Sequence, residues 1–196
     1  DGLARGIYPA IHHTQVLKAA REMKRPDVFQ AGGMRFLIEP SPLKSRLVIC
    51  GAGYIAAEIA PLAYHLGFEV SVLDDREDLL SADVYRGTER IPVTSYESCL
   101  QALPVDSATD VLIVTRSHAF DLQVLRQALR SPAGYIGMIG SRHKWKTLSS
   151  LLLEEGFGDD DLKRVHCPVG LEIGADSPEE IAVSIAAELI EHRALQ

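Results

Sequence analysis

A glycine-rich turn is the first feature of this sequence that suggests chemistry. Gly51 and Gly53 follow an apolar segment and precede a helix-like one, and Ala56 completes a G-x-G-x-x-A spacing. Gly51 permits a tight turn, Gly53 lets the backbone approach a phosphate, and Ala56 allows close packing of helix on strand. The helix that begins at Tyr54 offers free N–H groups to an anion. The spacing is typical of a nucleotide phosphate site, although a tight turn without a ligand gives the same pattern.

Two acids and an arginine end the next apolar segment, at Asp74, Asp75 and Arg76. Asp74 lies 23 residues after Gly51, close to the ~20-residue spacing at which an acid binds a ribose hydroxyl. We therefore expect Asp74, rather than Asp75, to face the ligand. Arg76 suits a 2′-phosphate, another anion or a neighbouring acid, and a solvated charge cluster is an equally good interpretation.

Polar residues also follow the apolar segment that ends near Thr115. Thr115 or Ser117 can cap the next helix. Arg116 can make a forked contact with a phosphate or carboxylate, and His118 can transfer a proton or donate a hydrogen bond. Asp121 lies one helical turn after His118, so we expect it to orient the imidazole.

A fourth cluster, Gly140, Ser141 and Arg142, again joins an apolar segment to a helix. Ser141 is a suitable cap and Arg142 a suitable anion clamp, with a capped helix and a surface arginine as the alternative. The later segment 166–180 is expected to form a loop over the pocket. Cys167, within that segment, is expected to be structural because Pro168 follows it and no partner base is evident.

Strands and helices alternate from residue 46 onward. The expected strands are 46–50, 69–75, 90–94, 110–115 and 134–140, and the expected helices are 54–67, 96–103, 119–130, 142–156 and 177–190. The last of these helices carries a capping box, Ser177 with Glu180. This alternation predicts a doubly wound, mostly parallel α/β sheet of Rossmann type. Because the carboxyl ends of such strands share one edge, the four clusters predict one pocket there, suited to a ligand with phosphate and hydrogen-bonding rings.

Residues 1–45 differ in pattern from the rest of the chain and are interpreted as an N-terminal extension, the remnant of a further domain. Residues 11–23 have the apolar spacing of a short helix, and residues 34–42 predict a short strand ended by prolines. Residues 46–196 then form the α/β domain, and the proline-containing stretch before them is a natural linker.

Composition limits the classes of protein to consider. The chain has 196 residues, 46% of them hydrophobic and 24% charged, which suits an ordinary globular protein. Its formal net charge of −7 argues against nucleic acid as a partner, because an acidic surface repels phosphate backbones. Three widely separated cysteines without a CxxC pair indicate neither a zinc site nor a disulfide framework and favour the reducing cytoplasm. No apolar run approaches the ~20 residues of a membrane helix.

Four segments together resemble the C-terminal, Rossmann-like domain of the XdhC/CoxI family, the xanthine dehydrogenase accessory factors. They are GAGYIAAEIAPLAYHLGFEVSVLDDR, VTRSHAFDLQVLRQAL, YIGMIGSRHKW and VHCPVGLEIGADSPEEIAVSIAAELI. The resemblance implies an accessory protein that binds the molybdenum cofactor (molybdopterin), protects it, assists its sulfuration and delivers it to a molybdenum hydroxylase apo-enzyme. The implied partners are that apo-enzyme and a cysteine desulfurase, and we expect a homodimer in the cytoplasm with no nucleic acid or membrane partner.

The resemblance also defines the expected site and its alternatives. The family often has His at the position of Tyr54 and Gly at that of Ser117. The expected cofactor-binding residues are Gly51, Gly53, Tyr54, Ala56, Asp74, Asp75, Arg76, Thr115, Arg116, His118, Gly140, Ser141 and Arg142. The alternative functions are an NAD(P)-dependent oxidoreductase, with His118 and Asp121 as catalytic candidates, and a nucleotide-sensing or scaffolding domain. No metal is expected to be bound directly by side chains.

Overall fold

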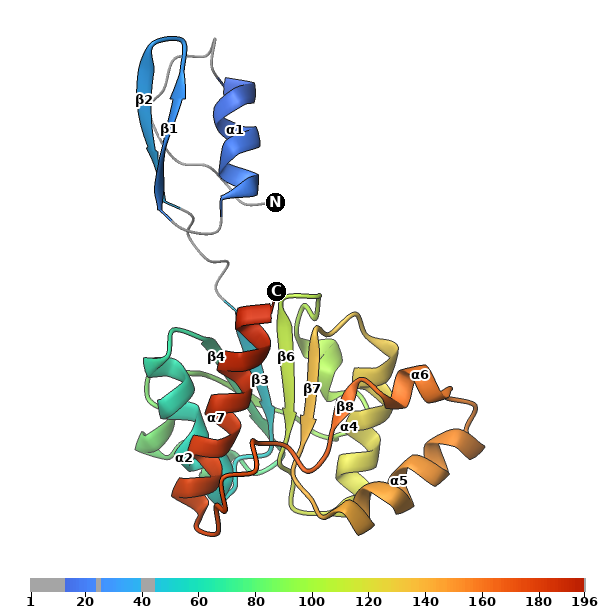
Figure 1. Ribbon diagram of the computed structural model, residues 1–196. Coiled ribbons are helices and arrows are strands. Elements are labelled where there is room, and N and C mark those ends of the chain that lie inside the picture. The colour runs from blue at the N-terminus through green and yellow to red at the C-terminus, as the bar shows by residue number, and fades with distance from the viewer. Residues whose placement is uncertain (1–12, 24–25, 40–44, 196) are drawn as a thin grey trace. The chain divides into compact units, whose positions relative to one another are not determined.

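The computed structural model describes residues 13–23, 26–39 and 45–195 (Figure 1). The chain divides into two compact units, residues 1–43 and residues 44–196. The proline-containing stretch predicted as a linker lies mostly outside the described residues, as do the first two residues of the predicted N-terminal helix.

The first unit is a helix packed on a hairpin. Its elements are α1 (His13–Glu22), β1 (Asp27–Ala31) and β2 (Met34–Ile38), and the two strands are antiparallel. Val16 and Ala19 of α1 pack with Ile38 of β2 in a small apolar cluster. The helix and β2 match the sequence prediction. The sequence does not predict β1, because only Val28 and Phe29 are large apolar residues in a strand that stays largely exposed.

The second unit is built on a six-stranded sheet in which every neighbouring pair is parallel. The strands are β3 (Arg46–Cys50), β4 (Glu69–Asp74), β5 (Glu89–Pro92), β6 (Thr109–Ile113), β7 (Tyr135–Met138) and β8 (Val165–His166). Their order across the sheet is β5-β4-β3-β6-β7-β8. The chain therefore winds outward from β3 in one direction and from β6 in the other, so the predicted doubly wound, Rossmann-like fold is confirmed.

Helices cover both faces of this sheet (Figure 1). They are α2 (Tyr54–His65), α3 (Glu77–Leu80), η2 (Asp83–Tyr85), η3 (Cys99–Ala102), α4 (His118–Arg130), α5 (Arg142–Glu154), α6 (Asp159–Leu162) and α7 (Pro178–Leu195). The core of one face contains residues of α2 and α7, and the core of the other contains residues of α4, α5 and η3. None of the described helices is both long enough and apolar enough to cross a membrane.

The inner strands β3, β4, β6 and β7 are mostly apolar because both of their faces are covered. In β3, Leu47 and Ile49 belong to the core beneath α2 and α7, whereas Val48 and Cys50 belong to the core beneath α4 and α5. This alternation explains why the sequence shows continuous apolar segments rather than a two-residue pattern. β8, with two residues, is too short to give such a signal, and the sequence does not predict it.

The predicted helix caps are present. The Oγ atoms of Ser117 and Ser141 accept hydrogen bonds from the backbone N–H three residues further on, at 3.2 Å in α4 and 3.1 Å in α5. Ser177 and Glu180 form the reciprocal capping box at the start of α7, with distances of 3.2 Å for both bonds. These caps fix where α4 and α5 begin, and therefore where the polar residues before them lie.

Gly51 occupies the point where the winding of the sheet changes direction. Its φ angle is +114°, and a Cβ atom there would lie 2.5 Å from the carbonyl oxygen of Val114, just beyond β6. Gly53, two residues later, has an extended backbone, and a Cβ atom on it would meet nothing within 4 Å. Gly51 is thus required by the fold, whereas the fold does not require a glycine at position 53.

Replacing Gly51 with alanine should destabilise the second unit by about 3 kcal/mol, because the new Cβ atom is both strained and in collision with backbone. Gly53→Ala is the matched control and should change the free energy of unfolding by less than about 1 kcal/mol. Urea unfolding followed by circular dichroism measures both changes. Equal stabilities of the two variants would contradict the close approach of the turn to β6.

Candidate functional site

The start of α2, at the carboxyl end of β3, has the features of an anion-binding site. Gly53 is the N-cap residue of α2, and among the described residues no side chain forms a cap hydrogen bond at this end of the helix. Tyr54 follows with 87% of its side chain exposed, so its ring does not cover the turn. Uncapped N–H groups and the positive end of the helix dipole attract negative charge. These features can hold a phosphate group.

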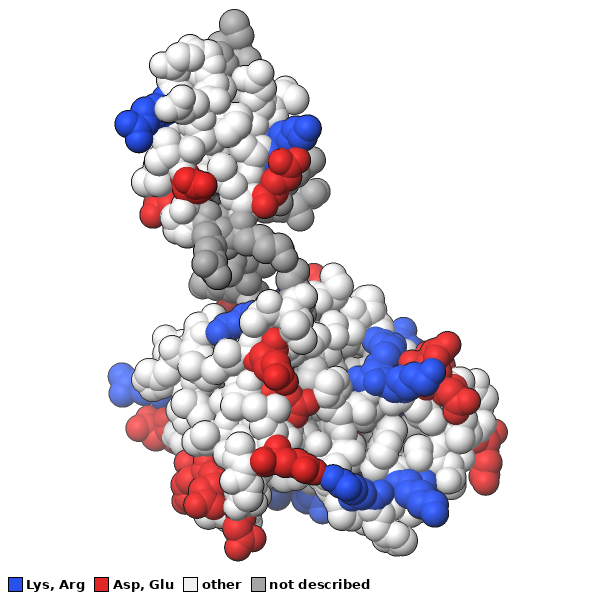
Figure 2. Space-filling view, in the orientation of Figure 1, with Lys and Arg blue, Asp and Glu red and all other residues white. Residues whose placement is uncertain are grey.

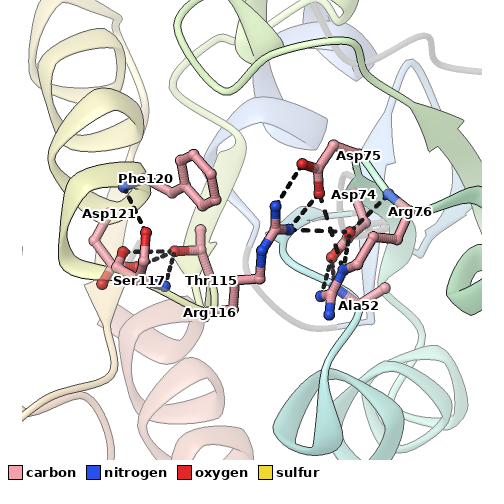
Figure 3. Close-up of polar contacts among 9 residues, drawn as sticks. All are labelled: Ala52, Asp74, Asp75, Arg76, Thr115, Arg116, Ser117, Phe120 and Asp121. Atoms are coloured by element: carbon pink, nitrogen blue, oxygen red, sulfur yellow. Dashed lines mark hydrogen bonds and ion pairs between the residues drawn. The ribbon is translucent and has the colours of Figure 1, made fainter.

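Asp74, at the end of β4, holds the glycine turn in place. Its carboxylate is completely buried and accepts a hydrogen bond of 2.7 Å from the backbone N–H of Ala52. It also accepts bonds of 2.9 Å from the backbone N–H, Nε and Nη2 of Arg76 (Figure 3). Both oxygens are therefore occupied within the protein. The sequence-based preference for Asp74 as the acid that faces a ligand is not supported by this burial; Asp75, with its side chain 24% exposed, is the more accessible acid.

Arg116 extends across the edge of the sheet from the end of β6 to the end of β4. Its two terminal nitrogens bind the two carboxylate oxygens of Asp75, and the Nη2–Oδ2 distance is 2.6 Å. Its Nη1 atom also lies 3.8 Å from Oδ1 of Asp74. We call the Asp75–Arg116 pair the clasp; Figure 3 shows Arg116 directed toward both acids. Because β3 lies between β4 and β6, the clasp crosses the end of β3, from which the glycine turn emerges.

Two aromatic rings lie beside the clasp. The guanidinium carbon of Arg116 is 4.6 Å from the centroid of the Phe120 ring, and the Tyr96 ring lies 4.9 Å from that of Phe120. Tyr96 is 1% exposed, and its hydroxyl makes no hydrogen bond with the part of the chain that the structure describes. Burial, then the charges of Asp74 and Asp75, and the interaction of the hydroxyl with the Asp74 carboxylate raise the pKa of this phenol above its usual 10. The sequence does not predict that either ring belongs to the site. The only signal is position, since Tyr96 comes soon after β5 and Phe120 soon after β6.

A buried ion pair, separate from the clasp, joins α4 to α5. Asp121 is completely buried, accepts a 2.7 Å hydrogen bond from Oγ1 of Thr115, and lies 2.6 Å from Nζ of Lys144. Lys144 also donates to the carbonyl oxygen of Ile139 at 3.0 Å. His118 is exposed, and Asp121 is turned away from it toward Lys144. The expectation that Asp121 orients the His118 imidazole is therefore wrong.

Arg142 and the segment 166–180 lie on the α5 and α7 side of the unit. Arg142 pairs with Glu172, and both side chains are at least 80% exposed. The N–H of Leu171 donates to the Ser184 carbonyl in α7 at 3.3 Å. Gly140, before α5, approaches the Lys144 side chain. Within the described residues, none of these contacts involves the glycine turn, so the structure brings Arg116, but not Arg142, into contact with the acids of the site.

Every arginine of the expected site is paired with a carboxylate. Arg76 binds Asp74, Arg116 binds Asp75, and Arg142 binds Glu172. Figure 2 shows side chains of both signs along the lower margin of the second unit, where the strands of Figure 1 end. An anion at the glycine turn therefore meets a local charge balance near zero and has to compete for Arg116.

Asp74→Asn should reduce stability at pH 7 by about 2–3 kcal/mol, because Arg76 loses its nearer charged partner and keeps only Asp75, at 3.9 Å. Burial by itself would raise the pKa of Asp74, but hydrogen bonds from the Arg76 side chain and from the N–H groups of Ala52 and Arg76 hold it well below 3.8. Because the pKa of Asp74 is lower in the folded than in the unfolded protein, its ionised carboxylate stabilises the fold at pH values above the unfolded-state pKa. That stabilisation is lost as the pH falls toward the folded-state pKa.

The wild-type protein should therefore lose stability as pH falls from about 5 toward 2, and Asp74→Asn should lose less over the same interval. Urea unfolding at a series of pH values measures this difference. Asp78→Asn, at an exposed acid of α3, is the control and should change stability by less than about 0.5 kcal/mol. An unchanged acid dependence in Asp74→Asn would contradict the low pKa.

Known proteins with similar sequences point to one family. Residues 47–189 match the family model described as the XdhC Rossmann domain. The chain is 33% identical over 159 residues to a probable xanthine dehydrogenase subunit of Bacillus subtilis, and 29% identical over 184 residues to the uncharacterized protein YqeB of Escherichia coli. These alignments cover 80% and 93% of this chain.

A solved structure agrees with the sequence matches. The crystal structure of a xanthine dehydrogenase from Bacillus halodurans superposes with a TM-score of 0.69 at 30% identity and covers 83% of this chain. This chain spans 45% of that protein, 44% of the Bacillus subtilis relative and 33% of YqeB, which is less than half the length of each. The glycine turn, the acids after β4 and Arg116 all lie within the matched range, and the chain belongs to the XdhC family through its Rossmann domain.

Proposed function

We propose that this chain binds the molybdenum cofactor at the carboxyl edge of its sheet and serves a molybdenum hydroxylase of the xanthine dehydrogenase type as an accessory protein. The observation that carries the proposal is the uncapped, open start of α2 at Gly53 in a chain of the XdhC family. The Bacillus subtilis relative is named as a probable component of xanthine dehydrogenase, which supports this class of partner.

The residues present fit the organic part of this cofactor, which joins a phosphate to a planar pterin. The N–H groups at the start of α2 suit the phosphate. Phe120 offers a ring face beside the clasp, over which the Arg116 guanidinium now lies. Asp75 can accept hydrogen bonds from ring N–H groups. When bound, the cofactor supplies the metal chemistry of the partner enzyme, and these side chains hold and orient it.

The cysteines of this chain support a separate sulfur donor for the proposed sulfuration. Cys50 and Cys99 are buried in the core. Cys167 is partly buried, and burial raises the pKa of its thiol to about 11. A thiol with such a pKa is almost entirely protonated at neutral pH and is a poor nucleophile. We therefore propose that sulfur comes from a partner such as a cysteine desulfurase. A homodimer remains part of the proposal.

An NAD(P)-dependent oxidoreductase is the alternative, because the glycine turn suits a dinucleotide equally well. Hydride transfer requires an acid or base beside the nicotinamide and a wall for the second substrate. His118 is exposed and Asp121 is engaged with Lys144, so neither forms the expected catalytic pair. This arrangement favours the accessory role.

Identification of the co-purified ligand tests the proposal. The chain should be purified from a host that makes molybdenum cofactor, and the bound material analysed by mass spectrometry for pterin and by elemental analysis for molybdenum. We expect pterin and molybdenum in near-equal amounts, without oxidation of xanthine by the chain alone. Stoichiometric NAD(P) with substrate-dependent hydride transfer would establish the alternative instead.

Gly53→Ala should reduce the bound ligand about tenfold while leaving the fold intact, because the new methyl group points into the open space where the phosphate approaches. Gly158→Ala is a matched control, since Gly158 is also an extended N-cap glycine, at the start of α6. Its ligand content should equal that of the wild type. A Gly53→Ala protein with full ligand content would place the ligand elsewhere.

A further inference from the structure

We propose that the clasp is a ligand-operated closure of the site, in which the phosphate of an incoming ligand takes Arg116 away from Asp75. The inference rests on the proposed ligand site at the start of α2 and adds how that site is regulated. It also narrows the ligand class to phosphate or pyrophosphate esters that carry a planar heteroaromatic ring.

The position of the clasp is the first argument. Neighbouring strands lie about 4.8 Å apart, so residues after β4 and β6 are separated by about 10 Å across β3. The glycine turn lies within this gap: the N–H of Gly51 donates to the Leu73 carbonyl in β4 at 2.7 Å, and the N–H of Val114 donates to the Cys50 carbonyl at 2.9 Å. The Arg116 side chain bridges the same gap to reach Asp75. A phosphate at the turn is thus beside the clasp.

The second argument is that the clasp is more exposed to solvent at its acid than the neighbouring Asp74–Arg76 pair. Asp74 is completely buried and receives bonds from Ala52 and Arg76, so that pair is fixed. The Asp75 and Arg116 side chains are 24% and 38% exposed. The clasp is bidentate, but its acid is open to solvent whereas Asp74 is not, and solvent exposure lowers what an ion pair contributes. The site therefore combines one permanent acid–arginine pair with one that a stronger anion can open.

The aromatic rings supply the third argument and the ligand class. Arg116 now lies over the face of Phe120. When Arg116 turns to a phosphate, that ring face becomes available for stacking with a planar heterocycle. Tyr96, which is 1% exposed, packs beside Phe120 and holds that ring in place. Loss of Arg116 from Asp75 also frees a carboxylate for ring N–H groups.

Asp75 thus competes with the ligand for Arg116. Replacing Asp75 should therefore increase the affinity for the ligand, whereas most substitutions in a binding site decrease it. If Asp75 acted only as a direct ligand contact, its replacement would weaken binding. If it closes the clasp, its replacement strengthens the binding of a ligand that has nothing to bond with Asp75. Inorganic pyrophosphate is such a probe, since it carries negative charge but has neither a ring nor an alcoholic hydroxyl group.

The experiment compares pyrophosphate binding by calorimetry in the wild type and in Asp75→Asn at low salt. We expect about five- to tenfold tighter binding by Asp75→Asn, which corresponds to the loss of one partly exposed ion pair and one like charge. Adding Arg116→Gln to Asp75→Asn should abolish the gain. Asp106→Asn breaks the Arg46–Asp106 pair at the opposite edge of the sheet and should bind like the wild type.

Thermal unfolding verifies that each variant is folded, and Asp75→Ser, which also removes the charge, replaces Asp75→Asn if the latter is unstable. Equal or weaker pyrophosphate binding by the folded Asp75 variants would overturn the clasp, as would a gain that persists without Arg116 or an absence of pyrophosphate binding in every form. These outcomes are separate from the identity of the natural ligand, because pyrophosphate carries neither pterin nor metal. Purification without molybdenum cofactor would overturn the proposed function alone.

Discussion

The hydrogen bond from the Ala52 N–H to the Asp74 carboxylate is the contact on which the site depends. It joins the glycine turn after β3 to the end of β4, and it is completely buried. A carboxylate at this depth is stable only with several donors, and Arg76 supplies the remaining three. The acid, the arginine and the turn therefore form one unit. Any change in one of them alters the position of the N–H groups that face a ligand.

As a result, the two neighbouring acids have different surroundings. Asp74 points inward and is committed to the turn, whereas Asp75 lies at the surface and binds a residue from another strand. Sequence spacing alone favours Asp74 as the ligand acid, because the expected distance from the first glycine is matched best there. The direction of a side chain at a strand end depends on the register of the strand, which residue types do not reveal.

Particular residues show how far the sequence predicts the structure. The strands β3, β4, β6 and β7 are predictable because burial on both faces makes most of their residues apolar. Ser117 and Ser141 are predictable as caps because capping requires only local geometry. The ion pairs are not predictable, because Arg116 meets Asp75 and Arg142 meets Glu172 only through the order of the strands. Tyr96 is missed for the same reason: its place beside the acids results from packing on Phe120.

The rigid backbone under the clasp determines what kind of motion can open it. Gly51 lies against the Val114 carbonyl so closely that no Cβ atom fits between them, and both strands bury their backbones in the core. The distance between the ends of β4 and β6 is therefore fixed. The Arg116 side chain, which is partly exposed, can move without any change in the backbone. Rotation of an exposed side chain takes picoseconds to nanoseconds. If a ligand opens the clasp as proposed, side-chain rotation is enough, and ligand selection then depends on whether a phosphate binds Arg116 better than Asp75 does.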